Sequence, residues 1–198
     1  MKQKVLLASN NAHKIKEIRA ILGDFFDIVS LREAGVESDP EETGKTFEEN
    51  ARIKAVAGMK ASGMPCIADD SGLEVLALDC RPGVMSARYS GSHGDDAANN
   101  EKLLAELADK PDRSARYVCV ICMAFPDGRE LEARGECYGE ILKEKSGNGG
   151  FGYDPLFYFP QFGKTFAEIS SEEKNEVSHR NAALKAFEKL WEKEINDK

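Results

Sequence analysis

The stretch ADDSGL at residues 68–73 places two adjacent carboxylates after an apolar run and follows them with a Ser-Gly pair. Apolar residues at 65–68 and 73–78 predict two short buried strands, so the acids are expected at a strand end, where Ser-Gly turns the backbone. Buried carboxylates need a compensating cation, and a divalent metal with oxygen ligands is a common one. A solvated turn is equally consistent, because Asp, Ser and Gly are turn residues.

Length and charge limit the classes of protein that fit. The 198 residues are 41% hydrophobic, which predicts a single domain, residues 1–198, with room for two lobes. Lys and Arg number 27 against 35 Asp and Glu, a net charge of −8. This balance argues against nucleic acid or an anionic membrane as the main partner, but leaves room for a small anion bound locally.

The cysteines predict a reduced, cytoplasmic protein. Their number, five, is odd, and four lie in apolar runs, as core thiols do. Cys119 and Cys122 form a CxxC, but neither a second CxxC nor a nearby His completes a zinc site. No targeting segment is visible, and no apolar run approaches the length of a membrane span.

The first 60 residues contain two loops that precede helices. An apolar strand at 4–8 leads into a polar loop and a helix marked by Ile15, Ile18 and Leu22. Such a loop presents backbone N–H groups and the helix dipole to an anion, with Asn11 and Lys14 as side-chain donors, although it lacks the P-loop glycines. An ordinary capped helix is the alternative.

A second strand at 25–31 leads into an acidic loop that ends at residues 43–44. Thr46 is expected to cap the following helix, with Glu49 at capping-box spacing. Glu42 lies just before this helix. Most of the loop acids are expected to be solvated, but Glu42 could complete a ligand set that begins with Asp70.

The second half of the chain alternates loops with strands and helices. Residues 81–94 are rich in Pro, Gly, Ser and Arg and predict a loop, followed by a helix over 95–107. Strands at 116–125 and 129–138 flank Pro126-Asp127-Gly128, a strong hairpin signal.

The segment 147–155 contains four glycines and the aromatic residues Phe151 and Tyr153, which suits a platform for a flat base; a mobile linker is the alternative. Lys174 lies in a predicted turn or short helix. Ser178-His179-Arg180 opens a long helix whose apolar stripe is expected in the core. His179 and Arg180 could reach a ligand or be solvated.

Taken in this order, these stretches resemble the inosine triphosphate pyrophosphatase family, the XTP/dITP diphosphatases. The family's usual Thr-Gly in the first loop is Ser9-Asn10 here, which keeps a hydroxyl and loses a glycine. The matching positions are residues 9–14 and Glu17, residues 42–44, 46–47 and 50–51, residues 69–73, residues 82–84 and 86–91, residues 149–157, Lys174, and residues 178–180.

The resemblance implies hydrolysis of deaminated purine nucleoside triphosphates (ITP, dITP, XTP) to monophosphate and pyrophosphate, which keeps them out of DNA and RNA. It implies Mg²⁺ held by Glu42 and Asp70, with Asp70 also accepting a proton from the attacking water. Asp69 is either a further ligand or a structural partner. The implied substrate-binding residues are Ser9, Asn10, Asn11, Ala12, His13, Lys14, Ser71, Phe151, Gly152, Tyr153, Asp154, Lys174, His179 and Arg180.

The resemblance also implies an α/β fold, with an elongated mixed β-sheet flanked by helices, two lobes with the active site in the cleft between them, and a homodimer. Two other functions stay open. One is a Maf-like pyrophosphatase for other nucleotides, disfavoured by Lys174 and residues 178–180. The other is a nucleotide-binding regulator without turnover, which would not need Glu42, Asp69 and Asp70 together. Preference among ITP, dITP and XTP is left open.

Overall fold

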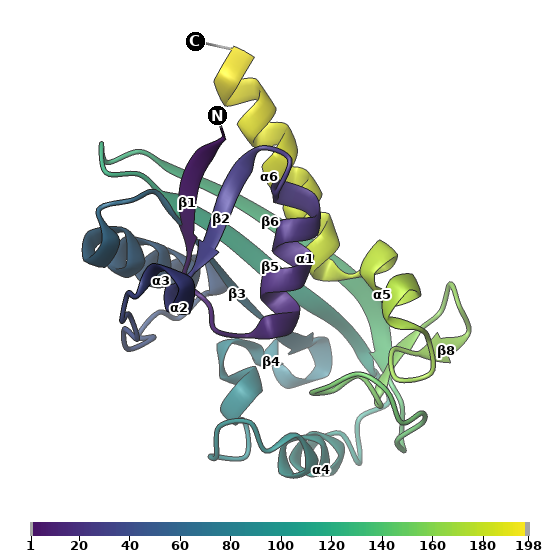
Figure 1. Ribbon diagram of the computed structural model, residues 1–198. Helices are drawn as coiled ribbons and strands as arrows, with labels where there is room; N and C mark the ends of the chain where they lie inside the picture. Colours follow the sequence, from purple (N-terminus) through teal and green to yellow (C-terminus); the bar gives the residue numbers. More distant parts are fainter. Residues whose placement is uncertain (1, 197–198) are drawn as a thin grey trace. The chain divides into compact units, whose positions relative to one another are not determined.

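The computed structural model describes residues 2–196, apart from the side chain of His13, and divides into two compact units (Figure 1). Unit 1 contains residues 2–70, 119–135 and 180–196, and unit 2 contains residues 71–118 and 136–179. Three strands have residues in both units: β3 (Cys66–Val75), β5 (Ser114–Ala124) and β6 (Glu130–Ile141).

Unit 1 has β1 at its centre, parallel to β2 with Gln3 opposite Phe26 and parallel to β3 with Leu6 opposite Cys66. Besides parts of the three shared strands, unit 1 contains β1 (Gln3–Leu7), α1 (Ala12–Leu22), β2 (Phe26–Ser30), α2 (Leu31–Ala34) and α3 (Phe47–Ser62). It also contains α6 (His179–Asn196), except for the first residue, His179.

Helices cover both faces of the sheet in unit 1. Val5 and Leu7 of β1 pack in one cluster with residues of α1 and α6, whereas Leu6, between them, packs in a second cluster with residues of α2 and α3. All three side chains are fully buried. Alternate residues of a strand point to opposite faces, so an unbroken apolar run indicates a strand buried on both sides.

Unit 2 is built on an aromatic core. The Tyr117 and Phe157 ring centroids lie 4.6 Å apart, and those of Phe157 and Phe166 lie 4.9 Å apart. Its own elements are η1 (Leu76–Leu78), β4 (Arg81–Pro82), η2 (Gly83–Arg88), α4 (Asp96–Glu106), β7 (Phe157–Phe159), β8 (Lys164–Thr165) and α5 (Ser171–Val177).

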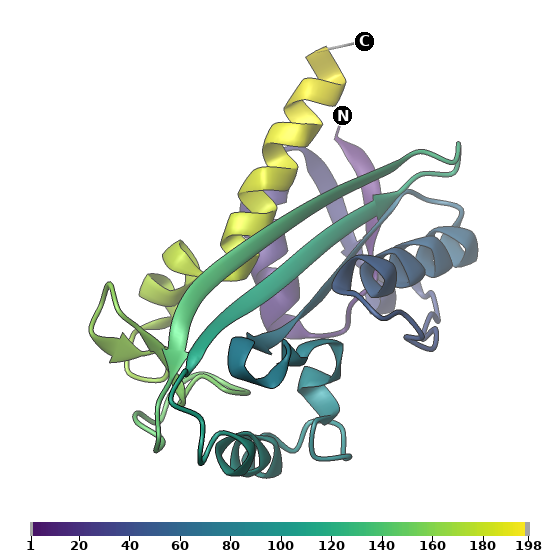
Figure 2. The same cartoon turned by 180° about the vertical axis from the view of Figure 1, so that it is seen from behind.

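The strand order is β2-β1-β3-β5-β6-β7-β8, with β4 paired to β3. The β1–β2 and β1–β3 pairs are parallel, while β3–β4, β6–β7 and β7–β8 are antiparallel. The predicted α/β fold with a mixed sheet flanked by helices is therefore confirmed. The predicted hairpin is confirmed too: Figure 2 shows β5 and β6 as long neighbouring strands, and Phe125 N donates to Arg129 O at 3.0 Å across the turn.

Two local predictions were wrong. Residues 66–75 form one continuous strand, so Asp69 and Asp70 lie within β3 and not at a strand end beside a turn, and residues 76–78 form η1. Residues 83–88, predicted as loop, form η2. The turn propensity of Asp, Ser and Gly is overridden because β3 is paired on both sides in the sheet, and tertiary pairing outweighs local preference.

The remaining sequence-level expectations concern thiols and membranes. All five cysteines are free, and Cys66, Cys119, Cys122 and Cys137 are buried, which confirms their prediction as reduced core residues. Within residues 2–196, no helix combines the length and the apolar character that crossing a bilayer requires.

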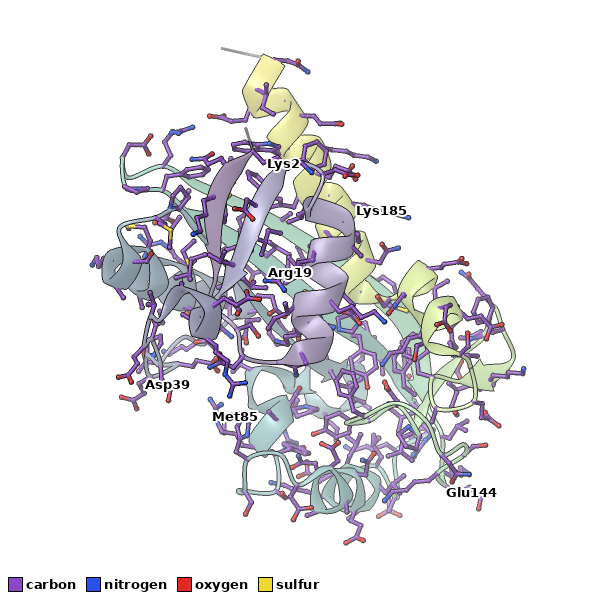
Figure 3. All side chains as sticks on the ribbon, in the orientation of Figure 1. Lys2, Arg19, Asp39, Met85, Glu144 and Lys185 are labelled. Atoms are coloured by element: carbon purple, nitrogen blue, oxygen red, sulfur yellow. The ribbon has the colours of Figure 1, made fainter. Side chains whose placement is uncertain are left out.

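The start of α2 is held by reciprocal hydrogen bonds between Ser30 and Glu33. Ser30 Oγ accepts from Glu33 N at 3.3 Å, and Ser30 N donates to the Glu33 carboxylate at 2.8 Å. Arg19 of α1, labelled in Figure 3, also donates to this carboxylate. The bond from the Ser30 backbone and then the bond from Arg19 lower the pKa of Glu33 from 4.5 to about 2.

Glu33→Gln should flatten the acid limb of the stability profile. Because the folded pKa lies below the unfolded one, ionised Glu33 stabilises the fold above pH about 4.5, and that contribution is lost as the pH falls toward about 2. In urea titrations, the free energy of unfolding should fall more steeply for wild type than for the variant in this window. Glu37→Gln is the control, and parallel wild-type and Glu33→Gln profiles would contradict the assignment.

Candidate active site

The candidate site depends on two adjacent acids that point to opposite faces of β3. Asp69 is 3% exposed and Asp70 is 8% exposed. Ile67, on the face of Asp69, packs with residues of α1 and α6, and Cys66, on the face of Asp70, packs with Met59 of α3. Strand alternation therefore directs Asp69 toward α1 and α6 and directs Asp70 toward α3.

Asp69 is surrounded by cations from α1 and α6. Lys14 Nζ lies 2.8 Å from Asp69 Oδ2, and Arg180 Nη2 lies 3.6 Å from the same oxygen. Arg180 also donates to Glu17 at 2.7 Å. Burial disfavours the charged form of Asp69, but Lys14 and Arg180 outweigh this effect and hold the pKa of Asp69 well below its usual range. Asp69 is therefore an ionised partner of two cations.

Asp70 shares a cation with Glu42. Lys54 Nζ of α3 lies 2.9 Å from Asp70 Oδ1 and 2.8 Å from Glu42 Oε1. Burial raises the pKa of Asp70, opposed by Lys54. Burial disfavours the charge of Lys54, but attraction to Asp70, Asp69 and Glu42 outweighs it and raises the pKa of Lys54. The structure thus brings the two predicted metal ligands, Glu42 and Asp70, to a single cation.

The loop that carries Glu42 is fixed to the start of α3. Gly44 N donates to Asn50 Oδ1 at 2.8 Å, and Asn50 is fully buried. A Cβ on Gly44 would lie 2.5 Å from that oxygen, so a larger residue cannot approach as closely. Thr46 caps α3 by accepting from Glu49 N at 3.2 Å, as predicted, while the Glu49 carboxylate accepts from Lys45 N.

Lys54 was missed in the sequence analysis. It lies in the predicted helix between Ala51 and Ala55, which are buried. A lysine beside an apolar helical stripe must either extend to solvent or find an acid, and its side chain here is only 16% exposed. The position of Lys54 beside the apolar stripe was therefore the feature of the sequence that could have indicated a partly buried lysine paired with an acid.

The donor set around Asp70 has the chemistry that Mg²⁺ requires. Glu42 and Asp70 supply carboxylate oxygens, the ligands preferred by hard cations, and the two groups already contact one positive charge. Within the described part of the chain, no group of three or more His, Cys, Asp or Glu residues could hold a metal ion. Two carboxylates suit Mg²⁺, because this ion usually keeps several waters and takes further oxygens from phosphates.

The loop before α1 is ordered by its own side chains. Ser9 Oγ accepts from Asn11 N at 3.2 Å, and Asn11 Oδ1 accepts from Lys14 N at 3.2 Å, which caps the helix. Asn10, Asn11 and Ala12 are exposed, and Ala12 begins α1; the side chain of His13, the next residue, lies outside the described part. The expected polar loop at a helix N-terminus is present.

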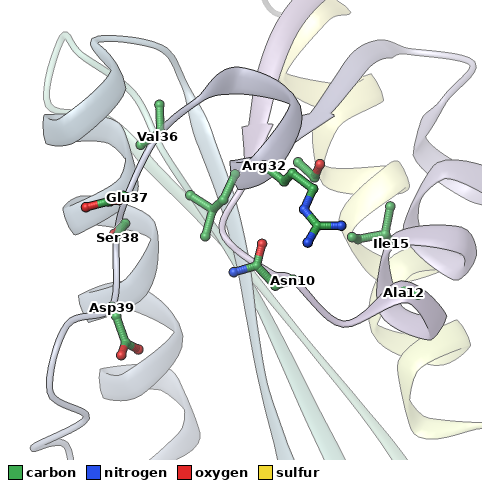
Figure 4. Close-up of a pocket in the computed structure, with 10 residues that line it drawn as sticks. Asn10, Ala12, Ile15, Arg32, Val36, Glu37, Ser38 and Asp39 are labelled. Carbon is green, nitrogen blue, oxygen red and sulfur yellow. The ribbon is translucent and has the colours of Figure 1, made fainter.

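A pocket of about 830 Å³ lies beside this loop within unit 1 (Figure 4). Asn10 and Ala12, two of the predicted substrate residues, line it together with Arg32 of α2. Its lining also includes the acids Glu37 and Asp39. The pocket offers both donors and acceptors to a polar ligand.

In unit 2, Asp154 organises the glycine-rich segment. It is 1% exposed and accepts from Phe151 N at 2.9 Å, from Tyr117 OH at 3.2 Å and from Lys174 Nζ. Tyr153 is buried, and its hydroxyl donates to Ser86 O at 2.9 Å. These contacts tie the segment to the core of unit 2 and argue against a linker.

Phe151 and His179 present rings in different environments. Phe151 is 52% exposed, with Lys174 Nζ 4.4 Å from its ring centroid. His179 is buried and stacks on Tyr117 with centroids 4.8 Å apart. Because His179 and Arg180 are both buried, the alternative in which they are solvated is wrong. Ser71, which follows Asp70 in β3, is half-buried.

Together, the mixed sheet and these residues define an α/β protein with buried carboxylates paired to lysine and arginine. A sequence model of the Ham1 family matches residues 5–190, so the chain belongs to the Ham1 family.

Relatives and solved structures agree with this family. A protein from Desulfotalea psychrophila named dITP/XTP pyrophosphatase is 56% identical over 91% of this chain and 81% of its own length. One of the same name from Clostridium perfringens is 53% identical over 92% of this chain and 94% of its own. The structure of the Staphylococcus aureus Ham1 protein has a TM-score of 0.90 and 45% identity, covering 97% of this chain and all of that one. The predicted family is confirmed.

Neutralising the two adjacent acids should affect stability differently. Asp69→Asn leaves Lys14 without its buried counter-charge and Arg180 with Glu17 alone, and should lower the free energy of unfolding by roughly 3 kcal/mol. Asp70→Asn removes a charge that burial disfavours and leaves Lys54 paired with Glu42, so it should change stability little. Denaturant titration at pH 7 measures both, and equal losses would refute the distinction.

Proposed function

We propose that this protein is a nucleoside triphosphate pyrophosphatase that hydrolyses deaminated purine nucleotides, dITP, ITP and XTP, to monophosphate and pyrophosphate. The observation that carries the proposal is the convergence of Glu42 and Asp70 on one cation, beside an acid held by Lys14 and Arg180. Relatives named dITP/XTP pyrophosphatase, matched over more than nine-tenths of this chain, support the substrate class. Removal of such nucleotides keeps them out of DNA and RNA.

Each cluster of residues has a distinct role in the proposed reaction. Glu42 and Asp70 would hold Mg²⁺, which when bound would offset the charge on the phosphates. Lys14 and the N–H groups at the start of α1, with Ser9, Asn10 and Asn11, hold the phosphate chain. Asp70 accepts the proton of the attacking water. Asp69 acts as the structural partner of Lys14 and Arg180.

The purine is assigned to side chains of unit 2. Phe151 offers an exposed ring for stacking, and Lys174 and Asp154 support its segment. His179 supplies a donor for the 6-carbonyl that distinguishes hypoxanthine and xanthine from adenine. We also propose a cytoplasmic homodimer, on the basis of the reduced cysteines and the family resemblance.

Asp70→Asn should remove turnover, because the amide can neither accept the proton nor serve well as a metal ligand. Pyrophosphate release from dITP and XTP should fall by roughly 10³-fold or more, given the usual contribution of a general base with loss of a ligand. Asp109→Asn, an exposed acid, is the control. Measuring dATP and dGTP in parallel tests base preference; absence of release from every nucleotide by wild type would favour a regulator without turnover.

Lys54→Met should strengthen Mg²⁺ binding in the absence of nucleotide. Lys54 occupies the oxygens of Glu42 and Asp70 that the ion needs, so its removal leaves two carboxylates for the metal alone. Titration calorimetry with MgCl₂ measures the affinity. Arg52→Met, on the same helix and paired with Glu130, is the matched control. Unchanged affinity in Lys54→Met would place the metal elsewhere.

A further inference from the structure

The peptide group at Gly152 is clamped by the first turns of α4. Gly152 N donates to the Asp96 carboxylate at 2.6 Å, and Gly152 O accepts from Asn100 Nδ2 at 2.8 Å. The same Nδ2 donates to Asp96 O at 2.6 Å, so the two α4 residues are coupled. Gly152 has φ +62, a left-handed conformation that disfavours other residues.

The peptide group that precedes Phe151 is held by a different acid, Asp154. Phe151 N donates to the Asp154 carboxylate at 2.9 Å. Two successive N–H groups, those of Phe151 and Gly152, therefore each donate to a different carboxylate, and the carbonyl of Gly152 is bonded as well. With the peptides on both sides of Phe151 fixed, the direction of its Cα–Cβ bond is fixed.

We infer that Asp96 and Asn100 are positioning residues for purine recognition, because they hold Gly152 so that the Phe151 ring is presented to the base. The inference rests on the proposed function for the identity of the ligand. Phe151 is half exposed while the backbone around it is bonded at three points, an arrangement that stabilises an exposed aromatic in one place.

Asp96 and Asn100 form different kinds of hydrogen bond with Gly152, so substitutions at the two positions remove different groups. Asn100 is 2% exposed and acts through its amide N–H group, while its Oδ1 accepts no hydrogen bond from the described residues. Asp96 acts as an acceptor, which an asparagine oxygen can replace without the charge. Asp95 caps the same helix by accepting from Ala98 N at 3.0 Å, so Asp95→Ala removes a cap of α4 without removing a donor or acceptor of the Gly152 bonds.

The kinetic test compares Asp96→Ala, Asn100→Ala, Asp96→Asn and Asp95→Ala. KM for dITP should rise about 10-fold in Asp96→Ala, the size expected from loss of a charge-assisted hydrogen bond, and about 3-fold in Asn100→Ala, which loses a neutral one, with kcat within about 2-fold of wild type in both. Asp96→Asn should recover most of the loss, and Asp95→Ala should resemble wild type. Inhibition by inorganic tripolyphosphate, which has no base, should be unchanged throughout.

A second readout does not need turnover. Trp191 is the one tryptophan in the sequence, so Phe151→Trp in a Trp191→Phe background gives a reporter in the loop. Acrylamide quenching of this reporter should increase with Asp96→Ala or Asn100→Ala and stay constant with Asp95→Ala. Failure of wild type to hydrolyse dITP would defeat the proposed function while quenching still tests the clamp.

Three results would overturn the inference: quenching that does not change in either clamp variant, equal effects of Asp95→Ala and Asp96→Ala on KM, or a loss of tripolyphosphate inhibition as large as the loss for dITP. If Asn100→Ala does not fold, the exposed Asp96 provides the same test alone.

Discussion

Two carboxylates on consecutive residues of a buried strand must face opposite sides of the sheet, and each side must then supply its own cation. β3 meets this constraint with Asp69 directed to α1 and α6 and Asp70 directed to α3. An unpaired buried carboxylate would shift its pKa until it became neutral. The positions of Lys14, Lys54 and Arg180 on three separate helices are therefore consequences of one dipeptide, and the docking of those helices and the charge of the site depend on each other.

The two acids differ because their surroundings differ. Around Asp69, cationic partners outweigh burial, and its pKa is held low. Around Asp70, burial dominates, its pKa is raised, and Lys54 is shared with Glu42. A carboxylate fully satisfied by ion pairs is poorly suited to accept a proton, whereas one with a raised pKa and a shared cation is better suited. The environment thus distinguishes the two acids without any difference in residue type, as the roles proposed for Asp69 and Asp70 require.

The sequence was most informative where short-range signals decide structure. The Asp-Gly hairpin, the Thr46 cap and the apolar runs of β1 and β5 depend on neighbours within a few residues, and each was confirmed. The ADDSGL stretch was mispredicted as a strand end followed by a turn because its partners come from distant parts of the chain, which composition and spacing do not reveal. Lys54 was missed for the same reason: its acids are a loop residue and a strand residue, brought to it by packing of α3.

The glycine-rich segment shows how backbone bonds can restrict a sequence that favours flexibility. Four glycines in nine residues would allow many conformations, yet Asp154, Asp96 and Asn100 bond the peptides around Phe151. Ordering such a segment during folding, rather than on ligand binding, removes that entropy from the free energy of binding. The glycines then serve for shape: Gly152 supplies a left-handed turn, and the bonded peptides fix the direction in which the half-exposed Phe151 side chain leaves the backbone.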